Sequence, residues 1–150
     1  MDDIELMQLA LEQAERAARV GEVPVGAVLA SSDGMIIACS YNQRESAHDP
    51  TAHAEMLVIR EASKALGRWR LTGTVLAVTL EPCLMCAGAA VLARIDRLIY
   101  GAPDPKAGAV ASLFTTLNDS RLNHQVAVQG GVLAEASRAL LQNFFRVRRG

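Results

Sequence analysis

The chain has 150 residues, of which 51% are hydrophobic, 21% are charged and 4% are aromatic, a balance that excludes a disordered chain, a collagen and a coiled coil. Fifteen Lys and Arg residues against sixteen Asp and Glu residues give a net charge of −1, which excludes an overall basic field for a polyanionic partner. The length predicts one domain over residues 1–150.

The first half of the chain predicts four elements. In chain order they are a helix from residue 3 to about residue 20, strands over 23–30 and 35–40, and a helix from residue 50 to about residue 66. Asp33-Gly34 between the two strands is a hairpin signal, so these strands are expected to pair antiparallel. Asp49 as N-cap and Pro50 as first helical residue predict the start of the second helix.

Strands and helices alternate in the second half. The predicted elements are a strand over 74–80, a helix from about Pro82 to Ala93, a strand over 97–100, a short helix near 112–117, a strand over 125–129 and a helix over 133–147. Such alternation predicts a partly parallel sheet covered on both faces. The predicted fold class is α/β, a three-layer α/β/α sandwich with a five-stranded mixed sheet.

The segments that direct a protein to membranes or export are not predicted. The N-terminus has no basic region followed by an apolar stretch, and the longest uncharged apolar run, 82–93, is too short for a bilayer span. Three cysteines do not make a secreted disulfide framework. A cytoplasmic location is therefore expected.

His53, Cys83 and Cys86 predict a metal site. Positions i and i+3 share one face of a helix, so both cysteines can reach one ion, and Pro82 leaves backbone N–H groups free to lower the thiol pKa. Two thiolates and one imidazole suit zinc and leave its fourth tetrahedral position open to water, which zinc converts to a source of hydroxide near neutral pH. One Zn²⁺ per chain is expected.

Glu55 is the expected catalytic residue. A carboxylate two residues after His53 can stay off the metal, take a proton from the bound water and return it to the substrate, an effect worth roughly 10²- to 10⁴-fold in rate. Positions i and i+2 of a regular helix differ by roughly 200°. The arrangement therefore requires a helix that points its N-terminus at the site, or an irregular first turn at His53.

Two other interpretations of the cysteine pair are a redox couple and a closed structural zinc site. A redox couple explains neither His53 nor Glu55. A closed site needs a fourth protein ligand, for which the spare candidates are Cys39, His48 and His124. None of these three has ligand spacing to another member of the group.

Four blocks of the sequence carry a family resemblance: residues 22–28, 49–55, 79–89 and 144–149. With its His-x-Glu and Pro-Cys-x-x-Cys motifs, the chain resembles the zinc-dependent nucleobase deaminases, and among them the tRNA adenosine deaminases. The resemblance implies hydrolytic conversion of the wobble adenosine of a tRNA anticodon loop to inosine, with hydroxide on zinc attacking the ring carbon and ammonia released. It also implies a homodimer. Pro103 and Pro105 stiffen the loop at 102–106. Because of this difference, the resemblance implies no detailed substrate preference at that loop.

The same resemblance assigns substrate-binding roles. Asn42 would hydrogen-bond the flipped base, although Tyr41-Asn42-Gln43 also suits a turn-capping Asn. The remaining candidates are the pocket wall at Val25, Gly26 and Ala54, phosphate contacts at Arg44 and Lys106, loop contacts at Asp104 and Asn123, and the C-terminal Phe145 and Arg149. Gly26 is expected to allow close approach to the pocket.

The last helix is expected to combine a core stripe with an RNA-binding end. Leu133, Ala136, Leu140, Phe144 and Val147 recur at steps of three and four and predict burial. Phe145 lies off that stripe, in the segment 138–149, which carries four arginines and no acidic residue. It is placed to stack on an unpaired base, or else to widen the apolar face. The basic end itself can hold phosphates or be a solvated helix terminus.

The assembly and the function each allow more than one interpretation of the sequence. The small apolar residues 87–91 can pack on a second copy or on the chain's own sheet. The competing functions are a deaminase of a free base or nucleoside, such as guanine, cytosine or cytidine, and a non-catalytic zinc-stabilised RNA-binding module. Glu55 argues against the module, and the basic C-terminal end argues weakly against a free base.

Overall fold

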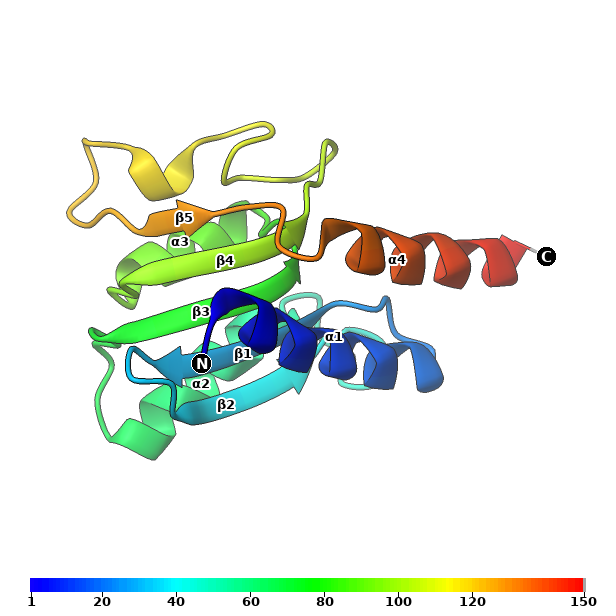
Figure 1. Cartoon of the computed structure of the whole chain (residues 1–150), viewed down its shortest axis with the longest axis horizontal. Coiled ribbons are helices and arrows are strands. Elements are labelled where there is room, and N and C mark those ends of the chain that lie inside the picture. Colours follow the sequence, from blue (N-terminus) through cyan, green and yellow to red (C-terminus); the bar gives the residue numbers. More distant parts are fainter. Residues whose placement is uncertain (150) are drawn as a thin grey trace.

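The computed structural model describes residues 1–149, and for Arg149 the backbone alone. In chain order the elements are α1 (Asp3–Arg19), β1 (Gly26–Ser31), β2 (Ile36–Tyr41), α2 (Ala54–Leu66), β3 (Thr74–Leu80), α3 (Leu84–Leu92), β4 (Arg97–Ala102), the 3₁₀ turn η1 (Thr116–Asn118), β5 (Ala127–Gln129) and α4 (Ala134–Arg149) (Figure 1). No helix within residues 1–149 is both long and apolar enough to cross a membrane.

The strands form one five-stranded mixed sheet, as predicted, and the structure gives their order as β2-β1-β3-β4-β5. β1 runs antiparallel to both β2 and β3, whereas β4 runs parallel to β3 and β5. Gly26 at the start of β1 pairs with Tyr41 at the end of β2, and Leu80 at the end of β3 pairs with Ala102 at the end of β4. The beginning of β1 and the ends of β2, β3 and β4 therefore meet at one edge of the sheet.

Helices cover both faces, which confirms the three-layer α/β/α prediction. Figure 1 shows α1 and α4 in front of the sheet and α2 and α3 behind it. On the front, Met7 and Ala10 of α1 pack on Val28 and Ala77. The larger rear core joins α2 and α3 to the other side of the strands and contains Val58, which is fully buried. The inner strands β1, β3 and β4 are buried along almost their whole length because both of their faces are covered.

The predicted hairpin is present, but β1 begins at Gly26 rather than at Val23. The N–H of Val25 donates to the carbonyl of Val23 at 2.8 Å, so the chain turns before it enters the sheet. Gly26 has a packing role in the fold: a Cβ there would lie 2.0 Å from the carbonyl oxygen of Ala10, so this glycine admits α1 to the sheet, and its expected role in the pocket wall stays a prediction.

Both central helices begin later than predicted. The Asp49 side chain accepts hydrogen bonds from the N–H and the hydroxyl of Thr51, closing a turn instead of capping a helix, and α2 begins at Ala54. Similarly α3 begins at Leu84, so Pro82 is not its first helical residue. His53 and Cys83 are therefore the residues that immediately precede α2 and α3 in the chain.

The short helix predicted near 112–117 is not formed. Residues 109–113 are turns, and only the single 3₁₀ turn at 116–118 follows. The backbone N–H groups of Val110, Ala111 and Ser112 all donate to one oxygen of the Glu81 carboxylate. This common acceptor fixes the chain in a turn at the point where the helix was expected to begin.

The stripe predicted for α4 is only partly covered. Ala136 is exposed, Val147 is 69% exposed, and Leu140 and Phe144 are half-buried. Ser137 is the buried residue of this helix. The C-terminal half of α4 runs out past the edge of the sheet, so periodicity there has no core to face (Figure 1).

Candidate active site

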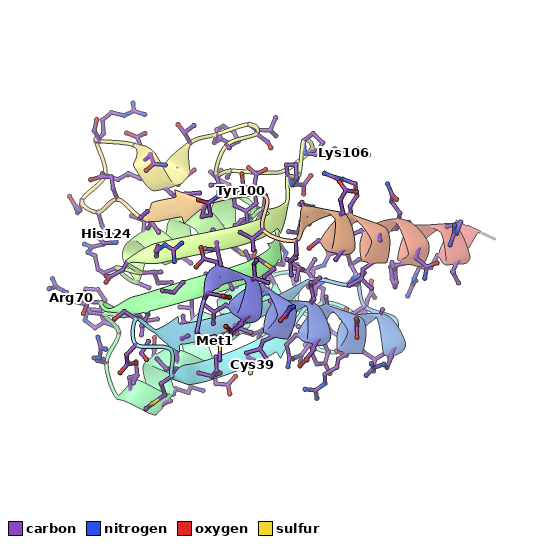
Figure 2. All side chains as sticks on the ribbon, viewed as in Figure 1. Met1, Cys39, Arg70, Tyr100, Lys106 and His124 are labelled. Atoms are coloured by element: carbon purple, nitrogen blue, oxygen red, sulfur yellow. The ribbon has the colours of Figure 1, made fainter. Side chains whose placement is uncertain are left out.

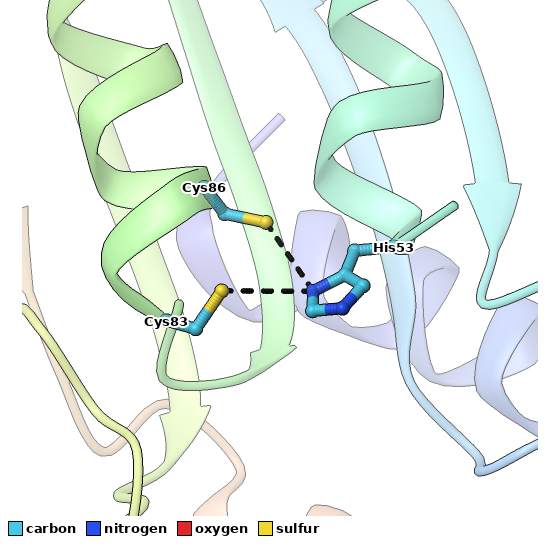
Figure 3. A group of neighbouring side chains, drawn as sticks. All are labelled: His53, Cys83 and Cys86. Atoms are coloured by element: carbon cyan, nitrogen blue, oxygen red, sulfur yellow. Dashed lines mark hydrogen bonds between the residues drawn. The ribbon is translucent and has the colours of Figure 1, made fainter. Parts of the chain in front are cut away.

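The N-termini of α2 and α3 converge at the edge of the sheet where β3 ends. His53 is the N-cap of α2, with φ −75° and ψ 148°, and Cys83 is the N-cap of α3, with φ −74° and ψ 177°. Both residues are extended, so their side chains lie in front of the helices. The His53 Nδ1 atom is 3.6 Å from the Cys83 Sγ atom and 3.5 Å from the Cys86 Sγ atom (Figure 3).

These three side chains fit a zinc ion. Their ligand atoms all lie within 4.8 Å of one another, and two sulfurs with one imidazole nitrogen form a donor set that zinc prefers. The prediction that Cys83 and Cys86 share one face of a helix is wrong in detail, because Cys83 precedes the helix. The two cysteines instead occupy the N-cap position and the first turn, from which both reach the same point.

No fourth protein ligand joins this group within the side chains that the structure describes. Cys39 is exposed on β2, and the His124 Nε2 atom is 2.7 Å from the carbonyl oxygen of Ile95. His48 lies in the exposed loop after β2. The closed structural site is therefore not supported, and the geometry is that of an open zinc site.

The two thiols differ in acidity. Contact with the Cys86 thiol and with the His53 ring lowers the pKa of Cys83, against the opposing effect of burial. The same contact and burial raise the pKa of Cys86. One thiolate is thus already favoured before a cation is present, and a metal ion favours the second because thiolates are its ligands.

Glu55 lies in the first turn of α2 beside the metal group. The side chain is 4% exposed, and burial raises the pKa of its carboxyl to about 6. The carboxyl contacts the Cys86 thiol but is not one of the grouped ligand atoms. Because His53 precedes the helix and Glu55 is inside it, the angular conflict expected for i and i+2 does not arise.

A pocket of about 210 Å³ opens at this edge of the sheet. Besides the metal group and Glu55, its lining includes Val23, Val25, Asn42, Arg44, Ala54, Leu80, Glu81, Asp104 and Ala107. Five of the predicted substrate-binding residues, Val25, Asn42, Arg44, Ala54 and Asp104, are thus brought together.

Asn42 is the polar residue of the pocket whose bonding is incomplete. The residue is 5% exposed, and its Oδ1 atom is buried with no hydrogen-bond partner among the described residues. The turn-capping alternative is therefore not supported. A buried amide oxygen without a partner costs free energy unless a ligand supplies a donor.

The other predicted substrate residues lie outside the pocket lining. Figure 2 shows Lys106 on the loop after β4 and His124, next to Asn123, toward the opposite end of the sheet. Gly26 faces α1, as described above. Phe145 is 41% exposed on α4, and the Arg149 side chain lies outside the described residues.

Two buried glutamates were not among the predicted site residues. Glu81 lines the pocket and is 2% exposed. Burial alone would raise the pKa of its carboxyl, but hydrogen bonds, the most effective of which comes from the Ser112 hydroxyl, lower that pKa to about 2. Glu22 is 1% exposed. The available signal was an acidic residue placed directly beside an apolar strand, where few charges are found.

Residues 1–102 match the family model of the cytidine and deoxycytidylate deaminase zinc-binding region, and the chain belongs to this zinc-dependent deaminase family. Over 140 residues it is 52% identical to the tRNA-specific adenosine deaminase of Bacillus subtilis, covering 93% of this chain and 86% of that protein. Its identity to the tRNA-specific adenosine deaminase of Haemophilus influenzae is 46% over 147 residues, covering 98% and 85%.

The fold is also that of solved structures. One, from a study of A-to-I editing by tRNA:A34 deaminases at the wobble position of transfer RNA, matches with a TM-score of 0.87 and 48% identity over 91% of this chain and 99% of that chain. A guanine deaminase from Nitrosomonas europaea matches with a TM-score of 0.83 at 22% identity, over 94% of this chain and 83% of that one, a likeness of fold alone.

Proposed function

We propose that this chain, acting as a single deaminase domain in the cytoplasm, converts the wobble adenosine of a tRNA anticodon loop to inosine. One observation carries the proposal: an open His53, Cys83 and Cys86 group stands beside a buried off-metal Glu55 at a pocket. Adenine C6 gains the oxygen of one water, its bond to the amino nitrogen breaks, and ammonia leaves. Identity near 50% to tRNA-specific adenosine deaminases supports the choice of substrate.

The chain's own residues divide the work. His53, Cys83 and Cys86 would hold zinc, which when bound is a Lewis acid that makes water nucleophilic near neutral pH. Glu55 accepts the two protons of the attacking water one after the other, and delivers the first to the ring nitrogen and the second to the departing amine. Asn42, whose Oδ1 atom lacks a partner, accepts a hydrogen bond from the base and orients it.

Arg44 is suited to an RNA phosphate. It lines the pocket and is exposed, and its guanidinium makes no hydrogen bond or ion pair with the described residues. Asp104 also shapes the loop, because its Oδ1 atom accepts the N–H groups of Lys106 and Ala107. An unpaired loop nucleotide can be flipped into such a pocket at low unstacking cost.

The substrate is tested by comparing ligands on the zinc-loaded protein. An anticodon stem-loop with a wobble adenosine is incubated in parallel with free adenosine, guanine, cytosine and cytidine. We expect inosine in the stem-loop alone. Faster deamination of a free base or nucleoside would replace the proposed substrate, and no deamination of any substrate would contradict the enzymatic proposal.

A second copy of the chain is part of the proposal. Of the small residues 87–91, Ala87, Ala90 and Val91 are buried in the chain's own core, and Gly88 and Ala89 are half-buried, so this run offers a second copy little apolar surface. The apolar surface lies instead where Leu84 of α3 meets Leu113 and Phe114, which are 52–53% exposed and line a common groove. Contiguous exposed apolar groups of this kind mark interaction surfaces. Sedimentation equilibrium should give a dimer for the native chain and a monomer for Leu113→Glu; a native monomer would contradict this.

Phe145 and its neighbour Phe144 offer a matched pair for testing RNA binding. The Phe144 ring is half-buried under the Arg148 guanidinium, 4.6 Å from its centroid, whereas Phe145 lines a surface hollow with Arg146. Phe145→Ala should weaken stem-loop binding by about 1–3 kcal/mol with little change in stability. Phe144→Ala should lower the free energy of unfolding by about 1–3 kcal/mol, less than for a fully buried ring.

Both effects are read from thermal melting and from stem-loop affinity at one fixed salt concentration. Equal destabilisation by the two substitutions, with stem-loop affinity unchanged in Phe145→Ala, would show that Phe145 serves packing and not RNA.

A further inference from the structure

Two buried glutamates stand beside two neighbouring inner strands of the sheet. Glu22 lies shortly before β1 and Glu81 directly follows β3, and these strands are neighbours. Because β1 and β3 are antiparallel, the start of one and the end of the other lie at the same edge. Both carboxylates are therefore placed at the edge of the sheet that carries the pocket.

Glu22 holds the loop that follows β2. Its Oε1 atom accepts the N–H of Glu45 at 3.1 Å, and its Oε2 atom accepts the N–H of Ser46 at 2.7 Å. These bonds lower the pKa of the Glu22 carboxyl against the effect of burial. The same loop carries Arg44 into the pocket lining. Residues 44–48 are all exposed, so apolar packing contributes little to the position of this loop.

Glu81 holds the loop that follows β4. Its Oε1 atom accepts the N–H of Asp104 at 3.0 Å and the Ser112 hydroxyl at 2.5 Å, while Oε2 accepts three successive N–H groups at 2.9–3.1 Å. A Cβ on Gly108 would lie 2.3–2.5 Å from this carboxylate, so the loop wraps closely around it. This loop brings Asp104 into the pocket lining.

We infer that Glu22 and Glu81 are positioning residues, each of which holds one of the two loops that flank the pocket and so sets the affinity for the RNA. The inference rests on the proposed function. Five hydrogen bonds occupy the acceptor sites of Glu81, and Glu22 does not line the pocket, so neither carboxylate is free for the substrate. Their effect on the reaction passes through Arg44 and Asp104.

Glutamine is the informative replacement at both positions. It keeps the length of the side chain but puts an NH₂ group in place of one accepting oxygen, and that group faces an N–H donor. Two buried N–H donors that face each other have no acceptor between them. Leaving a buried donor without an acceptor costs more free energy than the lost hydrogen bond itself contributed. Each loop should therefore loosen in its own variant only.

Amide hydrogen exchange measures this directly and independently of catalysis. In Glu22→Gln the N–H groups of Glu45 and Ser46 should exchange about tenfold faster or more, with Ala111 and Ser112 unchanged; Glu81→Gln should give the reverse. Each variant is the control for the other. Unchanged exchange in the targeted loop, or equal acceleration in both loops, would overturn the inference. If Glu81→Gln does not fold, Ser112→Ala removes one of the five bonds and should accelerate Ala111.

A double-substitution experiment tests the link to RNA. Arg44→Ala should raise KM for the stem-loop about fivefold in the native chain and in Glu81→Gln, but less than about twofold in Glu22→Gln, with kcat retained throughout. A full fivefold effect of Arg44→Ala in Glu22→Gln would contradict a role through Arg44. A native chain inactive on the stem-loop would contradict the proposed function instead, and the exchange pattern would still decide whether the glutamates hold the loops.

Discussion

Glu55→Gln should reduce deamination of the wobble adenosine by roughly 10²- to 10⁴-fold while zinc content and melting temperature stay near those of the native chain. The amide has the shape of the carboxyl but can neither accept the proton of the attacking water nor deliver it to the leaving amine. Because the Glu55 carboxyl is buried and its pKa is raised, a neutral side chain is tolerated at that position. Stability should therefore change little.

Single-turnover rates on the stem-loop and metal analysis of the purified variant measure the two halves of this expectation. Glu61→Gln is the matched control, since Glu61 belongs to the same helix but is exposed. Near-native rates for Glu55→Gln at full zinc occupancy would remove Glu55 from the proton transfer. Loss of zinc in that variant would show that the carboxylate supports the metal site.

Cys86→Ala should abolish both zinc retention and deamination. Cys86 is buried at 1% exposure and its sulfur is 3.5 Å from His53 Nδ1, so its removal leaves His53 and Cys83 as the remaining members of the metal group. Two remaining ligands bind zinc weakly compared with three or four. Zinc per chain, measured by mass spectrometry after dialysis against a chelator, should fall from about one to near zero.

Cys39→Ala supplies the control, because Cys39 is exposed on β2 and outside the metal group. That variant should keep its zinc and its activity. Retained zinc in Cys86→Ala would mean that the sulfur is not a ligand, and zinc loss in Cys39→Ala would mean that the site has a ligand from elsewhere in the chain.

The order of strands and helices was predictable because the periodicity of apolar residues reports burial directly. β3 was predicted with its observed bounds, 74–80, since a strand covered on both faces is a continuous apolar run. The helix starts were not predictable in this way. Asp49 and Pro50 satisfy the local rules for a helix start, yet the Asp49 side chain closes a turn with Thr51. Local signals could not show which hydrogen bonds the whole fold selects.

The metal group was predictable because ligand identity is a property of individual side chains. The loop at 103–112 was not, since its conformation depends on Glu81, which lies 23–31 positions earlier in the chain. The stripe of α4 was misleading for a related reason. A helix can repeat apolar residues at helical spacing beyond the end of the sheet, as Val147 does at 69% exposure.

The residues of the site are held in place by two kinds of structural element. The metal ligands and Glu55 stand at the beginnings of two helices packed on the sheet, whereas Arg44 and Asp104 stand on loops, each of which is hydrogen-bonded to one buried carboxylate. In evolutionary terms, this arrangement separates the reaction from the choice of substrate. Loop residues can be exchanged, shortened or lengthened by mutation while the metal centre is inherited unchanged, so a new specificity can arise without an inactive intermediate.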